Sequence, residues 1–75
     1  MIQIKKNMIE FKLEGEFIAM IQLLKVTGLV ASGGDAQMVV TDGQVKYNGV
    51  VDFRKRLKVR QGDIVEYDGN TIKVI

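Results

Sequence analysis

The chain has 75 residues, of which 47% are hydrophobic and 27% charged, a composition typical of one small globular domain. It contains no Cys and no His, which excludes disulfides, thiolate or imidazole metal sites and histidine-based catalytic triads. Because small secreted folds usually need such staples, we expect a cytoplasmic protein without a cofactor or metal. The longest apolar run, residues 17–21, is too short for a membrane span, so no membrane role is expected.

The first half of the chain predicts a strand followed by two short helices. Residues 9–14 alternate apolar and charged side chains and end at Gly15, the pattern of a half-buried strand. Apolar residues then recur at helical spacing from Phe17 to Leu24, and Gly28 is placed to end that helix. Ser32 is a good N-cap for a second helix, which Gly43 ends after about two and a half turns. So short a helix must pack against the first one.

The second half of the chain predicts short strands joined by tight turns. Asn48-Gly49 is a strong signal for a type I′ hairpin between strands at residues 45–47 and 51–53. Residues 57–59 indicate another short strand whose charges face outward, and residues 64–75 a closing hairpin around Asp68-Gly69. The predicted fold class is therefore α+β, with two short packed helices and a small antiparallel sheet of hairpins.

No group of residues has the pattern of an active site. Ser32 and Thr41 lack a histidine partner, and Ser32 already has a structural role as an N-cap, so we expect no enzyme. The pair Gly33-Gly34 at the same helix start has two interpretations. The glycines either let the two helices pack closely, which we favour, or expose backbone N–H groups to a phosphate.

The charge distribution is the strongest functional signal. Six of the eleven basic residues lie between Lys46 and Arg60, against a single acid, Asp52. Toward Arg60 the cations alternate with Leu57 and Val59, so one side can pack on the core while the other presents a row of cations. We expect Lys46 to extend this surface and the cations to have almost no acidic partners. Such a surface favours a polyanionic ligand.

The order of several short motifs resembles the S4-like RNA-binding domain, in particular its stand-alone bacterial YbcJ-like subgroup. The resemblance covers residues 9–75, and the ordered series is specific although each motif alone is weak. The motifs are QLLK at 22–25, GLV at 28–30, SGGDAQ at 32–37, GQVKYNG at 43–49, RKR at 54–56 and GDIV at 62–65.

The resemblance implies an alpha-L RNA-binding motif, in which two helices and a hairpin present one basic surface to structured RNA. The positions that match the family's RNA contacts are Ser32, Gly33, Gly34, Lys46, Asn48, Arg54, Lys55, Arg56 and Lys58. Gln37 departs from the family, which usually has Lys or Arg there, so one phosphate contact is missing. Tyr47 replaces a small aliphatic residue and either packs in the core, which its alternation with Val45 favours, or stacks on a base.

The sequence therefore predicts one RNA-binding domain over residues 1–75, with its core at 9–75, that binds structured RNA without catalysis. The resemblance implies ribosomal or ribosome-associated RNA as the partner, and we expect a monomer. Only five aromatic residues are present, and we expect most of them in the core, which argues against a platform that reads single-stranded bases. The alternative is a protein–protein interaction domain whose basic face docks an acidic partner.

Overall fold

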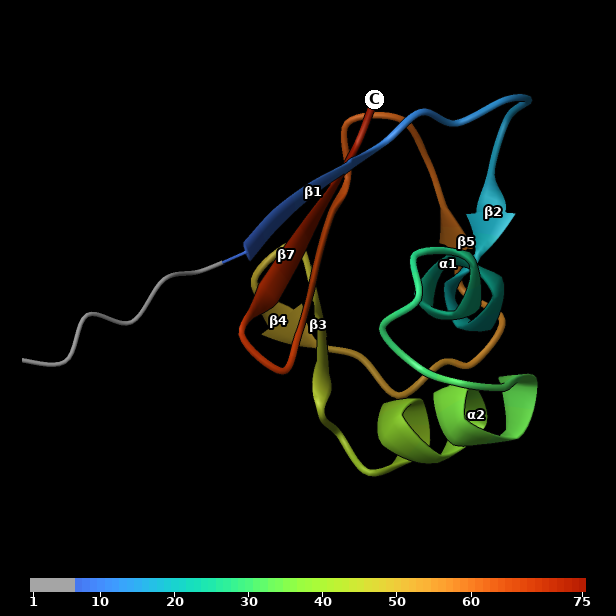
Figure 1. The fold of residues 1–75 in the computed structure, drawn as a ribbon, viewed down its shortest axis with the longest axis vertical. Coiled ribbons are helices and arrows are strands. Elements are labelled where there is room, and N and C mark those ends of the chain that lie inside the picture. Colours follow the sequence, from blue (N-terminus) through green and yellow to red (C-terminus); the bar gives the residue numbers. More distant parts are fainter. Residues whose placement is uncertain (1–6) are drawn as a thin grey trace, which may run out of the picture.

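A computed structural model of the chain describes residues 7–75 and contains seven strands and two helices (Figure 1). Five strands form one mixed sheet in the order β1-β7-β6-β3-β4, and β2 pairs with β5 in a separate two-stranded ribbon. The helices lie together beside the larger sheet, with β2 and β5 next to α1. The elements are β1 (Asn7–Phe11), β2 (Ile18–Ala19), α1 (Met20–Val26), α2 (Gly33–Thr41), β3 (Val45–Tyr47), β4 (Val50–Val51), β5 (Lys58–Val59), β6 (Ile64–Tyr67) and β7 (Asn70–Val74).

The five-stranded sheet has an apolar inner face and a mixed, mostly exposed outer face. Its register places Val65 opposite Ile72 and Phe11 opposite Val74, so these side chains share the inner face. The alternating residues form what we call the outer sheet face, which carries both charges. Its members are Met8, Glu10, Lys46, Val51, Ile64, Glu66, Thr71 and Lys73.

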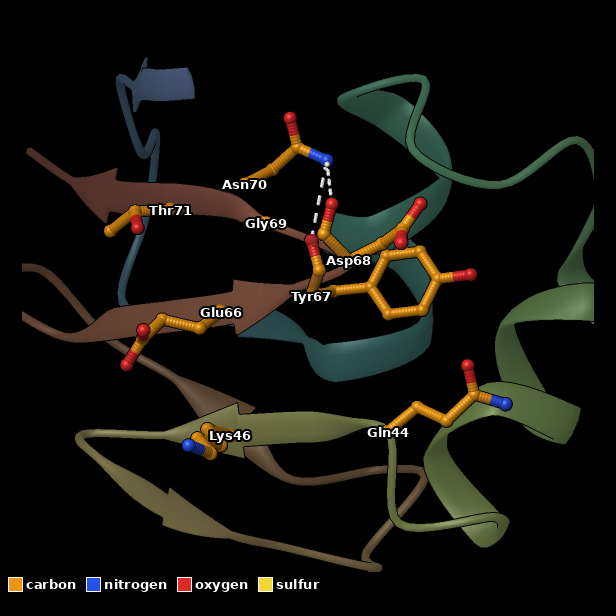
Figure 2. A pocket seen from close by; sticks show the side chains of 8 residues that line it. All are labelled: Gln44, Lys46, Glu66, Tyr67, Asp68, Gly69, Asn70 and Thr71. Atoms are coloured by element: carbon orange, nitrogen blue, oxygen red, sulfur yellow. Dashed lines mark hydrogen bonds between the residues drawn. The ribbon is translucent and has the colours of Figure 1, made fainter. Parts of the chain in front are cut away.

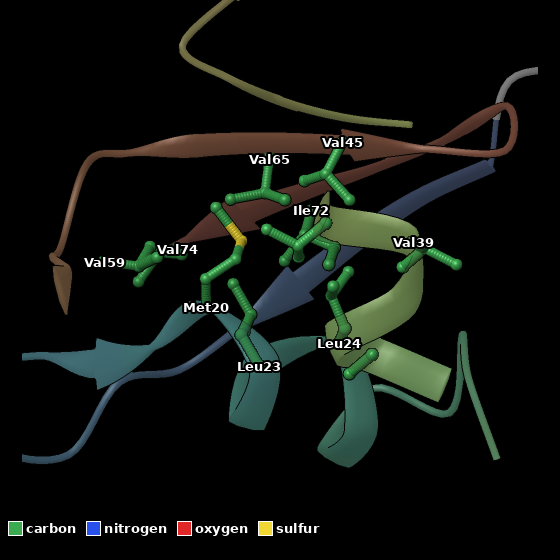
Figure 3. Close-up of a cluster of buried hydrophobic side chains, with 11 residues drawn as sticks. Met20, Leu23, Leu24, Val39, Val45, Val59, Val65, Ile72 and Val74 are labelled. Atoms are coloured by element: carbon green, nitrogen blue, oxygen red, sulfur yellow. The ribbon is translucent and has the colours of Figure 1, made fainter. Parts of the chain in front are cut away.

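The core lies between the inner face of the sheet and the two helices. Figure 3 shows side chains of α1 and α2 meeting valines and an isoleucine of the strands. No polar or charged residue within 7–75 is fully buried. The buried cluster consists of Met20, Leu23, Leu24, Ala36, Val39, Val40, Val45, Val59, Val65, Ile72 and Val74. One cluster therefore joins both helices, the larger sheet and β5.

Both helices end in the same way, as their glycines predict. Gly28 and Gly43 have φ of +78° and +77°, a conformation that glycine adopts without strain. After α1, the N–H groups of Gly28 and Leu29 donate to the carbonyls of Lys25 and Leu24. After α2, Gly43 and Gln44 repeat these two bonds, so each helix ends in a Schellman motif. Neither helix within residues 7–75 has the length and apolar character needed to cross a membrane.

The predicted second helix, the type I′ turn at Asn48-Gly49 and the closing hairpin around Asp68-Gly69 are confirmed. Ser32 accepts a hydrogen bond from the backbone N–H of Asp35 at 3.2 Å and begins a nine-residue helix. Asn48 and Gly49 have φ of +50° and +87°, and Asp68 and Gly69 likewise have positive φ of +49° and +77°.

Three expectations about the elements need correction. The first helix begins at Met20 rather than Phe17, because Ile18 and Ala19 pair with β5 instead of extending the helix. Phe53 follows β4 in an exposed loop rather than continuing the strand. The sheet is antiparallel from β7 to β4, but β1 joins β7 in parallel, so the whole is mixed.

Candidate nucleic-acid interface

Residues 54–60, which we call the basic segment, are held in place by two apolar anchors. Val59 is fully buried, and the half-buried Leu57 packs against the core. Lys58 lies between these anchors and is exposed, as the alternation predicts. Lys58 and Val59 form β5, whose pairing with β2 fixes the direction of the strand. The cations are therefore attached to the core through their neighbours in the sequence.

The basic segment also caps the first helix through its backbone. The N–H of Met20 donates to the carbonyl of Leu57 at 2.9 Å, and the N–H of Ile21 donates to that of Lys55 at 3.3 Å. The first N–H groups of an α-helix have no partner within the helix, so these two bonds satisfy groups that otherwise need water. The loop from Lys55 to Leu57 is thus hydrogen-bonded to the N-terminus of a helix that is itself anchored in the core.

The side chains of the basic segment surround an open hollow of about 480 Å³. Its lining is four cations around one aliphatic side chain: Arg54, Arg56, Leu57, Lys58 and Arg60. Four positive charges around one depression raise the local concentration of anions and suit a phosphate backbone. Arg contributes a planar fork that binds phosphate with two hydrogen bonds.

Arg54 differs from the other cations because it has an acidic partner. Its Nη2 donates to Asp52 Oδ2 at 2.7 Å, and its Nε donates to Oδ1 at 3.0 Å. The backbone N–H of Arg54 also donates to Oδ1. The guanidinium lowers the pKa of Asp52, mainly through the side-chain hydrogen bond, and the carboxylate raises the pKa of Arg54. The expectation of cations almost without acidic partners is wrong for Arg54, but this is the only salt bridge within residues 7–75.

Lys46 lies apart from the basic segment. Its neighbours on β3, Val45 and Tyr47, face the core, so Lys46 projects from the outer sheet face opposite Glu66. There it helps to line a different hollow of about 160 Å³ with Glu66, Thr71 and the 68–69 turn (Figure 2). The charges of Arg54 and Arg60 act instead at Tyr47, where they partly offset the rise in its pKa. The structure therefore does not bring Lys46 into one hollow with the basic segment.

Asn48 and Tyr47 join the hairpin tip to the turn at residues 60–63. Asp63 accepts from the Tyr47 hydroxyl at 2.6 Å, from the Arg60 backbone N–H at 2.8 Å and from the Asn48 amide at 3.3 Å. Asn48 Oδ1 in turn accepts from the N–H of Ile64. Both ends of the Asn48 amide are thus engaged within the chain, and the half-buried Tyr47 packs on the core, the role its alternation favoured.

The same contacts set the pKa values at this junction. Burial alone raises the pKa of Asp63, but the hydrogen bonds from Tyr47, Arg60 and Asn48 outweigh it, and the net shift is downward. The Tyr47 hydroxyl responds in the opposite sense, because its hydrogen bond to Asp63, its burial and the Asp63 charge raise its pKa more than the charges of Arg54 and Arg60 lower it. Three donors therefore keep the Asp63 carboxylate ionised next to Arg60, the last residue of the basic segment.

The start of α2 places two glycines where neither packing nor backbone conformation requires them. A Cβ on Gly33 would meet nothing within 4 Å, and one on Gly34 would meet only Ser32 Oγ at 3.7 Å. Neither residue has a positive φ. Close helix packing, the interpretation we favoured from the sequence, is therefore wrong, and the open backbone beside the exposed Ser32 fits the alternative of an approaching ligand. Gln37 is exposed one turn further along α2.

Two residues that matter for this surface were not identified from the sequence as site residues. Phe17 was expected in the core, but it is 43% exposed and the Lys58 ammonium lies 4.8 Å from the centre of its ring. Its fit to the helical spacing hid this position. Asp63 entered the sequence analysis only as part of the family motif GDIV and not as a site residue.

The fold and the surface together define a class of protein. Two packed helices, the hairpin that follows α2 and an adjacent surface of cations form the alpha-L arrangement expected from the sequence. A sequence model of the S4 domain family matches residues 11–75. The chain therefore belongs to the S4 domain family.

Relatives and a solved structure agree with this assignment. YbcJ of Escherichia coli (strain K12) is 36% identical over 58 residues, which cover 77% of this chain and 83% of that protein. The Bacillus subtilis (strain 168) protein named "Probable ribosome maturation protein RlbA" is 33% identical over 57 residues, 76% of this chain and 80% of its own. The solution structure of E. coli YbcJ, described as an alpha-L motif involved in RNA binding, aligns with a TM-score of 0.71 and 36% identity over 100% of this chain and 96% of that one.

Proposed function

We propose that this protein binds structured RNA through the basic segment and acts by binding rather than by catalysis. The observation that carries the proposal is the hollow of residues 54–60, where four cations are held by buried anchors and by the first turn of α1. Its cations neutralise phosphates and release counterions, and the rigid support selects RNA by shape. Support also comes from the similar structure of YbcJ, which is described as involved in RNA binding.

Among the predicted contacts, the structure favours a ranking. Lys55, Arg56 and Lys58 are exposed in the basic segment, and Arg54 belongs to it with part of its guanidinium committed to Asp52. Ser32, Gly33 and Gly34 offer an open backbone at the start of α2. We place Lys46 and Asn48 lower, because one lies on the outer sheet face and the other is engaged with Asp63.

We further propose ribosomal or ribosome-associated RNA as the ligand. The support is the B. subtilis relative named as a ribosome maturation protein. The monomeric state, the cytoplasmic location and the single domain over residues 1–75 remain predictions. Crosslinking the protein to RNA in cells and sequencing the recovered RNA tests the choice of ligand. Enrichment of ribosomal RNA precursors or ribosomal RNA is the expected result, and an even distribution over all transcripts contradicts it.

A titration separates RNA recognition from the docking of an acidic protein. A labelled stem-loop and a labelled homopolymer of equal length are titrated at several salt concentrations, with an acidic polypeptide as competitor. We expect tighter binding of the stem-loop and a slope of log affinity against log salt of about −2 to −4.5, as for about three to five phosphate contacts. Equal affinity for both RNAs, or full competition by the polypeptide, would reject the recognition of RNA structure.

A further inference from the structure

Two exposed aromatic side chains flank the basic segment, and within residues 7–75 a cation lies over the ring of only one of them. Phe53 is 60% exposed, but its ring lies against the end of α2, where a Cβ on Gly43 would come within 2.9 Å of it. Phe17 is 43% exposed. Its ring contact is the Lys58 ammonium, 4.8 Å from the ring centre. An aromatic ring thus stands at the surface beside a cation of the hollow.

The position of Phe17 is fixed even though its ring is exposed. Ile18, the next residue, pairs with Val59 in the β2–β5 ribbon, and Ala19 pairs with Lys58. The backbone next to Phe17 is therefore paired with the strand that carries Lys58. A ring fixed beside a phosphate-binding cation has the arrangement by which proteins hold an unpaired nucleotide, with the base on the ring and the phosphate on the cation.

We infer that Phe17 is the stacking surface for one unpaired base of the RNA that the basic segment binds. This inference rests on the proposed function and adds the ligand feature, an unpaired nucleotide next to a duplex. An exposed cation–π contact is weaker than the stacking of a base on an aromatic ring. Binding therefore exchanges partners: the Lys58 ammonium leaves the ring for a phosphate, and the base takes its place. The expectation that too few aromatic residues are free for stacking is revised at this one position.

Three RNAs test the inference: a duplex with one bulged nucleotide, the same duplex with an abasic residue at the bulge, and the fully paired duplex. The wild-type protein should bind the bulged RNA more tightly than the abasic one. Phe17→Leu should remove this preference, weakening binding of the bulged RNA about 5- to 100-fold and leaving the abasic RNA within about twofold. If Phe17 only holds Lys58 in place, Phe17→Leu weakens all three RNAs equally, which contradicts the inference.

A second variant reports the contact directly. The chain contains no Trp, so Phe17→Trp introduces its only tryptophan, whose emission reports on this site. Its emission should be quenched by the bulged RNA and much less by the abasic one. Met8→Trp is the matched control, because Met8 is exposed on the outer sheet face and should show no quenching. Equal quenching of Phe17→Trp by both RNAs overturns the stacking role.

The outcomes also distinguish the two proposals. Wild-type protein that binds none of the three RNAs contradicts the proposed function itself. Wild-type protein that binds all three equally, with a salt-dependent affinity, leaves the proposed function standing and contradicts only the role of Phe17.

Discussion

The basic segment and the outer sheet face both carry exposed cations, but they arrange them differently. On the outer sheet face, Lys46 is opposite Glu66 and Lys73 is opposite Glu10, so each positive charge has a negative neighbour across the strands. In the basic segment, four cations line one hollow, and within residues 7–75 only Arg54 forms a salt bridge. The two surfaces therefore differ both in the number of their cations and in how closely acids accompany them, and an excess of unpaired cations favours a polyanion.

The largest expected effect comes from removing two unpaired cations of the hollow. Arg56→Ala combined with Lys58→Ala should weaken binding of the stem-loop by at least about 30-fold, because two charge-assisted contacts to phosphate are lost. The melting temperature should change little, since both side chains are exposed. Fluorescence anisotropy and thermal unfolding measure the two quantities.

The matched control for this double variant removes the same charge from the other surface. Lys46→Ala combined with Lys73→Ala should reduce affinity less than threefold, because acidic neighbours already offset both cations. Equal losses in the two double variants would mean that the position of the charges is irrelevant, and the comparison between the surfaces would then fail. The control also tests the predicted RNA contact at Lys46.

Asp63 joins the hairpin to the base of the basic segment, and its removal should show in stability. Asp63→Asn should lower the free energy of unfolding at pH 7 by about 1–3 kcal/mol, because three donors lose an ionised acceptor. The pKa of Asp63 is lowered in the folded state, so its contribution is present above the ordinary carboxyl pKa and is lost as the pH falls below it.

Denaturation between pH 7 and pH 3 checks the sign of this dependence. The difference between wild type and Asp63→Asn should shrink as the pH falls through the lowered pKa. Asp68→Asn is the control, because Asp68 lies exposed in a type I′ turn where Asn is equally suitable. A difference that is constant over the whole range would show that ionisation of Asp63 does not contribute.

The smallest expected effect concerns the one paired cation of the basic segment. Asp52→Asn should raise affinity for the stem-loop about two- to fivefold, because it releases the Arg54 guanidinium from its competing carboxylate. Asp42→Asn changes the net charge equally but lies at the end of α2, away from Arg54 in the sequence. If both variants raise affinity to the same extent, net charge alone explains the effect.

Much of the fold could be predicted because its signals are local. Ser32, Gly28, Gly43 and Asn48-Gly49 each fix a cap or a turn through chemistry contained in a few residues. The β2–β5 ribbon could not be predicted, since two residues are too few for alternation and Phe17 fitted the helical spacing. The parallel pairing of β1 was also hidden, because alternation reports the faces of a strand and not its direction.

The sequence predicted where the positive charges of the candidate site cluster, but not which side chains lie beside them. Clustering along the chain located residues 54–60, and their buried anchors followed from Leu57 and Val59. The alternation of Lys46 with Val45 and Tyr47 already implied its position on the outer sheet face. We gave more weight to its closeness in sequence to the basic residues. The contact between Phe17 and Lys58 joins residues 41 apart in sequence, and no local sequence pattern around either residue predicts it.

The parallel pairing of β1 with β7 has a consequence for how the chain folds during synthesis. β1 lies at the edge of the sheet and pairs with β7, with Asn7 opposite Asn70, 63 positions later. At about 5–20 residues per second, the ribosome needs roughly 3–13 s after making β1 to complete its partner. The helices and the 45–51 hairpin rely on closer contacts and can form during that interval. We therefore expect β1 to be among the last strands to dock, and substitutions in β7 should release it before they disturb the helices.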